Sequence, residues 1–205
     1  MKIFAFVDVH GNKKIIDDII KNVKKNDPDL LICLGDLSEF GQKSEELLEK
    51  FRILNKPMLI IPGNHDEYEL KKAAKKFDFC IYLHKGAYKV NNIIFFGYGG
   101  GGFSFEEPEL EFIAKKFKSE LKKEDKIIIL SHAPVYGTKT DYMDGLGHRG
   151  NRSLLKIIKE IKPMLVLCGH FHENAGKTDK VDSTIILNPG PSGKFIEING
   201  NSINF

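Results

Sequence analysis

The sequence has no tryptophan, only three cysteines and no long apolar run. Nowhere do about 18 apolar residues follow one another, the length needed to cross a membrane as a helix. The apolar run at residues 3–7 stops at Asp8, too soon for the core of a secretory signal. We therefore expect a cytoplasmic protein without a membrane partner.

The cysteines Cys33, Cys80 and Cys168 are odd in number, far apart, and lie in or near apolar runs. This distribution favours buried, reduced thiols over a disulfide framework. A chain of 205 residues is large enough to bury a core without such bridges. With no repeat and no Pro/Ser-rich linker, residues 1–205 are expected to form one domain.

An excess of charge of either sign is also missing. Lys and Arg number 31 against 28 Asp and Glu, which gives a formal net charge of +3. The lysines are spread over most of the predicted helices rather than gathered in one block. Such a surface has a weak bias towards anions and gives little support for nucleic-acid binding.

Short apolar runs of strand type alternate with amphipathic stretches of helical periodicity. Strands are expected at residues 3–7, 30–34, 58–61, 127–130 and 164–167, and helices at 13–25, 44–51, 67–76, 108–121 and 153–161. Consecutive strands are expected between residues 81 and 96 and from 176 to the end. Alternation interrupted by consecutive strands predicts an α/β fold with four layers, a helix-sheet-sheet-helix sandwich of two mixed β-sheets.

A polar cluster follows each of five apolar runs. The clusters are Asp8-Val9-His10, Gly35-Asp36, Gly63-Asn64-His65-Asp66, Ser131-His132 and Gly169-His170-Phe171-His172. Ligands of open α/β sheets bind outside the carboxyl ends of the strands. The five clusters are therefore expected to converge on one site.

The types of side chain in these clusters indicate a metal centre. They are carboxylates, imidazoles and one amide, without a thiolate, which suits Mn, Fe, Zn, Co or Ni. In extended backbone, residues i and i+2 project to the same side, so we expect Asp8 to pair with His10 and His170 with His172. Each pair could hold one ion. A single Asp-x-His or Gly-Asp is an ordinary loop, so the prediction rests on all five together.

Other segments carry weaker signals. The glycine-rich residues 97–102 predict a loop, and without a following Lys-Ser/Thr and helix start they are better explained as a mobile loop near the site than as a phosphate cradle. His148 and Arg149 precede a predicted helix, whose N-terminus favours anions, but they also fit a basic surface loop with Asn151 as a helix cap. Asn12 likewise fits a substrate-side amide or the cap of the helix at 13–25.

The order of the five clusters resembles the motif set of the calcineurin-like metallophosphoesterases, and spans residues 8 to 172. The likeness extends to Asn188-Pro189-Gly190, which is similar to a turn in the small single-domain prokaryotic phosphodiesterases. Many of those, however, have Cys where this chain has His65. Phosphoprotein phosphatases of the superfamily continue Gly-Asp into an arginine motif, and this chain has none after Asp36.

The resemblance implies a double β-sheet sandwich and a dinuclear centre that hydrolyses phosphate mono- or diesters with a metal-bound hydroxide as nucleophile. One ion would be held by Asp8, His10, Asp36 and His172, and the other by Asp36, Asn64, His132 and His170. Asp36 would bridge them. His65 would stabilise charge at the scissile ester or protonate the leaving oxygen. Asp66 would orient that imidazole, or else cap the next helix.

Two alternatives remain open at this stage. A metal-binding scaffold for partner proteins would be expected to have lost ligands, and none is lost here. A metal-dependent nuclease would need a basic groove with stacking aromatics, for which Phe103 and Phe105 are the only hint. A small-molecule phosphate ester is therefore the expected substrate. The oligomeric state is open, though an exposed strand edge in the tail could serve a dimer.

Overall fold

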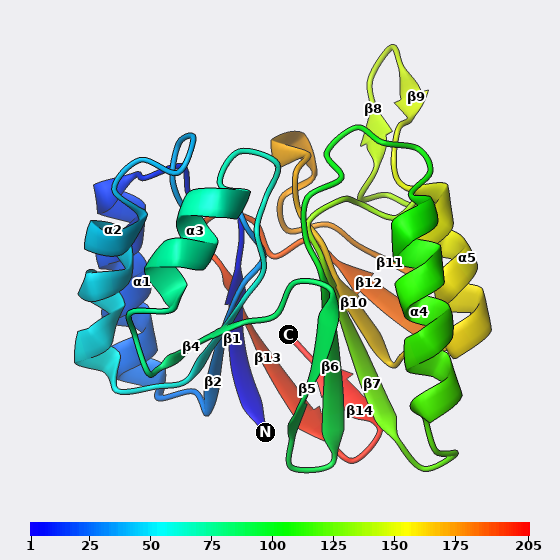
Figure 1. Ribbon diagram of the computed structural model, residues 1–205, viewed down its shortest axis with the longest axis horizontal. Helices are drawn as coiled ribbons and strands as arrows, with labels where there is room; N and C mark the ends of the chain where they lie inside the picture. Colours follow the sequence, from blue (N-terminus) through cyan, green and yellow to red (C-terminus); the bar gives the residue numbers. More distant parts are fainter.

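A computed structural model describes residues 1–205 and shows two six-stranded β-sheets packed face to face, with helices on both outer sides (Figure 1). The helices on one side are α1 (Lys13–Asn26), α2 (Ser44–Phe51) and α3 (Glu67–Ala74). Those on the other side are α4 (Pro108–Glu120) and α5 (Arg152–Ile161). Two short 3-10 turns, η1 (Arg52–Leu54) and η2 (His172–Asn174), complete the helical segments.

The first sheet has the strand order β14-β13-β1-β2-β3-β4. Its strands are β1 (Lys2–Phe6), β2 (Leu30–Cys33), β3 (Met58–Ile60), β4 (Cys80–Tyr82), β13 (Lys194–Asn199) and β14 (Ser202–Asn204). The strands β1 to β4 are parallel, whereas β13 and β14 join antiparallel at one edge. The sheet is therefore mixed.

The second sheet has the order β11-β12-β10-β7-β6-β5. Its strands are β5 (Gly86–Val90), β6 (Ile93–Tyr98), β7 (Lys126–Ser131), β10 (Leu165–Leu167), β11 (Thr178–Val181) and β12 (Thr184–Leu187). Parallel pairing joins β6, β7, β10 and β12, and the two edge strands are antiparallel. This sheet is mixed as well.

Three apolar layers hold these elements together. Because side chains alternate across a strand, Phe4 and Phe6 of β1 pack against α1 and α2, while Ile3 and Ala5 pack against the second sheet. A third layer joins the outer face of the second sheet to α4 and α5. Sheets covered on both faces need continuous apolar strands, which is why the runs could be recognised in the sequence.

The predicted four-layer α/β sandwich of mixed sheets is thus confirmed. Three local elements were not expected: the turns η1 and η2, and a small hairpin of β8 (Tyr142–Met143) and β9 (Gly147–His148), which stands above the edge of the second sheet in Figure 1. Strands of two residues are too short to show an alternating pattern. None of the helices has the length and apolarity to span a bilayer.

Candidate metal centre

Loops that follow five parallel strands bring the seven predicted metal ligands to one edge of the molecule. Asp8 and His10 follow β1, Asp36 follows β2, Asn64 follows β3, His132 follows β7, and His170 and His172 follow β10. The first three strands belong to one sheet and the other two to the second. The site is therefore built across the junction of the two sheets.

Asp36 lies between two imidazoles. Its Oδ2 atom is 3.9 Å from Nε2 of His10 and 3.5 Å from Nε2 of His132. Ligand atoms that share an ion at bonds of about 2.1 Å are about 3 to 4 Å apart. The other oxygen, Oδ1, accepts a hydrogen bond of 3.1 Å from the backbone N–H of His65. Asp36 thus places one carboxylate oxygen within 4 Å of a ring nitrogen of each of these two histidines.

The environment of His132 leaves only its Nε2 atom free to bind a metal ion. The ring is fully buried, and its Nδ1 lies 2.9 Å from the carbonyl oxygen of Leu34. An Nδ1–H that donates to this carbonyl places the lone pair on Nε2, which is 3.0 Å from Oδ1 of Asn64. Burial lowers the pKa of His132, so the ring stays neutral. Two acceptors that face each other at this distance are stabilised by a cation between them.

The imidazoles of His10 and His172 face each other in the same way. Their Nε2 atoms are 3.1 Å apart, and Nε2 of His172 is 4.0 Å from Oδ1 of Asp8. Burial, followed by the proximity of His172 and His65, lowers the pKa of His10 despite the opposing charge of Asp36. Asp8, His10 and His172 therefore form a compact set of donors.

Two buried polar atoms of the centre have no hydrogen-bond partner, Oδ1 of Asp8 and Nε2 of His170. The other oxygen of Asp8 accepts the backbone N–H of His170 at 2.9 Å. Burial and the charge of Asp36 raise the pKa of Asp8 to about 8, and burial lowers that of His170 to about 4. An unpaired buried polar atom is costly, and a divalent cation would satisfy both atoms. The donor set therefore fits the metals that the sequence implied.

The backbone of the ligand loops departs from the expected extended form. Asp8, His10, Asp36 and His170 have φ values of 58°, 49°, 48° and 71°. The sequence argument from alternating side chains was therefore wrong in its geometry, because β1 ends at Phe6 and the following residues turn in the left-handed region. Such strained residues cluster at functional sites. Asp8 and His10 still meet, but His170 packs against His132, with ring centroids 5.3 Å apart.

The loops after β2 and β3 approach each other closely at two glycines. A Cβ atom at Gly63 would overlap the carboxylate of Asp36, and one at Gly35 would overlap the backbone of Gly63. Gly35 also has a φ of 98°, which side chains rarely tolerate. Both glycines are needed for the position of Asp36.

His65 and Asp66 have different surroundings. The half-buried His65 ring lies with its centroid 6.0 Å from that of His10. Asp66 occupies the N-cap position of α3, but its carboxylate accepts hydrogen bonds from the backbone N–H groups of Gly63 and Leu37, at 2.8 and 2.9 Å, instead of capping the helix. Asp66 therefore joins the loops that carry Asn64 and Asp36.

The three residues predicted to contact substrate, Asn12, His148 and Arg149, each interact with another part of the protein. The Asn12 side chain caps α1 by accepting from the N–H of Ile15 at 3.2 Å. His148 lies in β9, with Nδ1 2.7 Å from the buried carboxylate of Asp141. The guanidinium of Arg149 is 5.8 Å from the ring centroid of Phe105. The interpretation of Asn12 and Asn151 as helix caps is confirmed, whereas substrate contact by any of the three stays a prediction.

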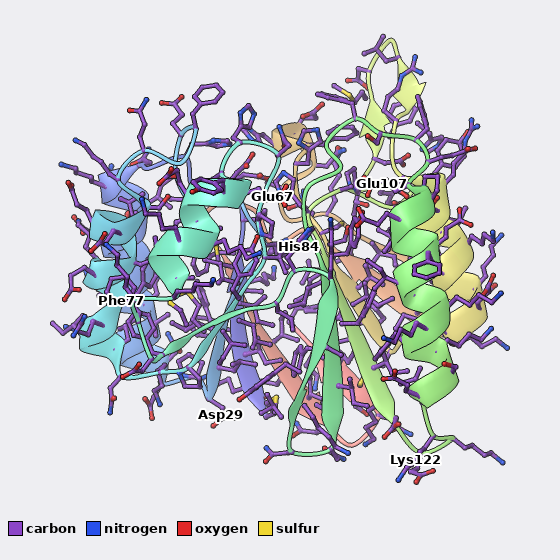
Figure 2. The ribbon with its side chains drawn as sticks, viewed as in Figure 1. Asp29, Glu67, Phe77, His84, Glu107 and Lys122 are labelled. Carbon is purple, nitrogen blue, oxygen red and sulfur yellow. The ribbon has the colours of Figure 1, made fainter.

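One residue that contacts a loop of the site, His84, was not predicted from the sequence. Its Nδ1 accepts the N–H of Gly99 at 3.0 Å, and its Nε2 lies 3.7 Å from Glu67, near the centre of the view in Figure 2. A Cβ atom placed on Gly102, three residues further on, would lie 3.4 Å from the Asn64 side chain and 3.7 Å from the His170 ring. His84 thereby holds the glycine-rich loop beside the metal centre. Its only signal in the sequence was a histidine just after a short apolar run.

Comparison with known proteins agrees with this geometry. The family described as calcineurin-like phosphoesterase matches residues 1–174. An uncharacterized protein of Methanocaldococcus jannaschii is 32% identical over 96% of this chain and 91% of its own length. A probable glycerophosphodiester phosphodiesterase of Arcobacter nitrofigilis is 27% identical over 81% of this chain, which spans 64% of that protein.

Solved structures share the fold at low identity. A protein of Thermus thermophilus superposes with a TM-score of 0.78 at 18% identity, covering 99% of this chain and 96% of its own. A dimetal phosphatase of Danio rerio gives a TM-score of 0.67 at 11% identity over 98% of this chain and 93% of its own. These likenesses support the sandwich architecture.

Proposed function

We propose that this chain, which belongs to the calcineurin-like phosphoesterase family, hydrolyses small phosphate esters with two divalent metal ions. The observation that carries the proposal is the position of Asp36 Oδ2 between the Nε2 atoms of His10 and His132. The unpartnered Asp8 Oδ1 and His170 Nε2 supply further ligand atoms on the two sides.

The proposed ligand sets share Asp36. One ion would be held by Asp8, His10, Asp36 and His172, and the other by Asp36, Asn64, His132 and His170; the ligand atoms of Asp8, His10 and His172, and those of Asp8, Asp36 and His132, lie within 4.8 Å of one another. Their nitrogen and oxygen atoms suit Mn, Fe, Zn, Ni or Co. When bound, the ions supply a hydroxide nucleophile at neutral pH and neutralise charge on the phosphoryl oxygens. Against two carboxylates, two divalent ions leave a formal charge of about +2 to attract a phosphate.

The chain's own residues position the ester and handle the leaving group. His65 is anchored through its backbone N–H, which donates to Asp36, so its imidazole is held next to the centre while the ring remains half-buried. In the proposed mechanism this imidazole stabilises charge on the leaving oxygen or donates a proton to it. Asp66 supports that position through its bonds to the backbone of Gly63 and Leu37.

Relatives favour a diester as substrate. Besides the probable glycerophosphodiester phosphodiesterase, a probable cyclic nucleotide phosphodiesterase of Synechococcus is 27% identical over 76% of this chain. The activities for which these two relatives are named both cleave phosphodiesters, so we expect this chain to act faster on a diester than on the matching monoester.

The test is hydrolysis of an aryl phosphate diester and the matching monoester by chelator-stripped protein, with Mn, Ni, Co, Zn or Mg added back. Turnover should require added metal and fall at least about a hundredfold in His65→Ala, as for loss of a general acid. Phe112→Ala, an exposed residue on α4, is the control that should leave turnover unchanged. Metal-independent turnover, or none with any metal, would refute the proposal.

A further inference from the structure

Two exposed phenylalanines stand against histidines of the metal centre. Phe40 is 67% exposed and its ring lies 4.8 Å from that of His65, at an interplanar angle of 85°. Phe103 is 64% exposed and lies 4.6 Å from the ring of His170, at 73°. Both contacts have the edge-to-face geometry that aromatic rings prefer. Each phenylalanine thus keeps most of its surface in water beside a functional side chain.

The two rings come from different sheets and lie at different ends of the centre. Phe40 belongs to the loop between β2 and α2, and Phe103 to the loop between β6 and α4, directly after the glycine-rich residues 97–102. His65, beside Phe40, neighbours His10 at 6.0 Å between centroids. His170, beside Phe103, neighbours His132 at 5.3 Å. An ester bound at Asp36 would therefore have an aromatic ring on either side.

Phe40 and Phe103 contribute little to the stability of the fold. An exposed phenylalanine buries little apolar surface, and Phe40 also has a φ of 48°, a genuine outlier for a bulky residue. Phe103 packs against the buried Phe171, with ring centroids 5.5 Å apart. His84 holds the same loop at Gly99. What distinguishes these two rings from other exposed apolar residues is their position against histidines of the metal centre, where a bound ester would cover them.

The chemistry of the rings limits what that ligand can be. Phenylalanine offers a flat apolar face and no hydrogen-bonding group, so it recognises neither the hydroxyls of a sugar nor those of glycerol. Exposed polar residues, Glu39 and Ser104, flank the two rings, so the surface is not a continuous apolar groove for an acyl chain. Aromatic side chains of this kind stack on planar rings such as nucleobases, independently of base identity.

We propose that Phe40 and Phe103 form a stacking subsite for the planar aromatic group of the ester, so that the substrates are nucleotides rather than sugar or glycerol phosphates. This inference rests on the proposed phosphoesterase function, which it deepens. The phosphate enters the metal centre, and the base lies against one or both phenylalanine rings.

A matched pair of ligands tests the subsite. Adenosine 5′-monophosphate and ribose 5-phosphate differ only in the base, and both can compete with the aryl diester. We expect the nucleotide to inhibit about tenfold more strongly in the metal-loaded protein. Phe40→Leu or Phe103→Leu, which keep apolar bulk but remove the ring, should reduce that preference, while Phe112→Leu should leave it intact. Equal inhibition by the two ligands would overturn the proposal.

The absence of tryptophan provides a second readout that does not need turnover. In Phe103→Trp or Phe40→Trp the new indole is the only one in the chain. Stacking predicts that the nucleotide quenches its fluorescence, whereas ribose 5-phosphate at the same occupancy of the metal centre does not. If no ester is hydrolysed but quenching is selective, the proposed function fails and the subsite stands. If hydrolysis occurs without selective quenching, the subsite fails alone.

Discussion

The two ends of the metal centre are built differently. At the His132 end, formed by Asn64, His132 and His170, the imidazole of His132 is fully buried and hydrogen-bonded at Nδ1 to the backbone. At the His172 end, His10 and His172 join the buried Asp8, and their side chains are 25% and 59% exposed. His172 sits on the short turn η2 rather than at the end of a strand.

This difference separates proposed ligands that also support the fold from proposed ligands whose side chains have no such structural role. A buried imidazole that is hydrogen-bonded at Nδ1 is pre-organised, so an ion bound at its Nε2 orders little else. An exposed imidazole on a turn must be ordered when the ion binds, and that ordering reduces the affinity. The His132 end should therefore bind its ion more tightly and contribute more to stability.

The largest expected effect is on the stability of the His132 end. In metal-free protein, His132→Ala leaves a cavity and an unpaired Leu34 carbonyl, and should lower the free energy of unfolding by about 3 to 5 kcal/mol. His172→Ala, at an exposed site, should change it by less than about 0.5 kcal/mol. Urea denaturation in the presence of a chelator measures both. Equal losses in the two variants would remove the distinction between the ends.

The retention of metal should follow the same order. When the loaded protein is dialysed against a chelator, we expect the ion at the His172 end to leave first, at a chelator concentration at least about tenfold lower than for the other ion. The metal content, measured by elemental analysis, should then fall in two steps. His172→Ala should show only the later step. Loss of both ions in a single step would contradict the prediction that the two ends bind metal independently.

The ionisation of Asp8, a buried member of the proposed ligand set at the His172 end, provides a test without metal. Burial raises its pKa from 3.8 to about 8, so between these values the folded protein holds a proton that the unfolded chain has released. The free energy of unfolding of the metal-free protein should therefore fall as pH rises through this window.

The lowered pKa values of His10, His132 and His170 oppose this trend only below about pH 6.5, where unfolded histidine is protonated. Between about pH 6.5 and 8 the loss due to Asp8 should be about 2 kcal/mol. Asp8→Asn should abolish that slope in thermal unfolding with chelator present. An unchanged slope in the variant would show that Asp8 ionises normally.

Much of this arrangement was predictable because the relevant signals are local. The apolar runs and helical faces are periodic, so the four layers followed from them, and polar residues directly after parallel strands had to meet at one edge. The prediction of a shared centre thus needed no distances. It depended only on where Asp8, Asp36 and His132 stand relative to their strands.

The rest depends on contacts between distant segments. The left-handed backbone at Asp8 and His10 is set by the packing of loops, and no pattern of side chains reveals it. The role of Asp66 depends on Leu37, 29 residues away, and that of His84 on Gly99, 15 residues away. A short apolar run followed by one histidine is compatible with many structures. The unequal burial of His132 and His172 was hidden for the same reason.

The smallest expected effect concerns Asn12, just beyond His10 in the less protected end. Its side chain caps α1, so Asn12→Ala should lower the free energy of unfolding by about 1 kcal/mol. Asn12→Ser retains a capping oxygen and should be nearly neutral for stability, but it lacks the amide that a substrate could contact. Comparing kcat/KM of the two variants therefore separates the roles. If the serine variant matches the parent chain in both measurements, Asn12 is only a cap. If its kcat/KM falls while its stability does not, the amide contacts substrate. The exposed end of the centre would then also be the end that binds the ester.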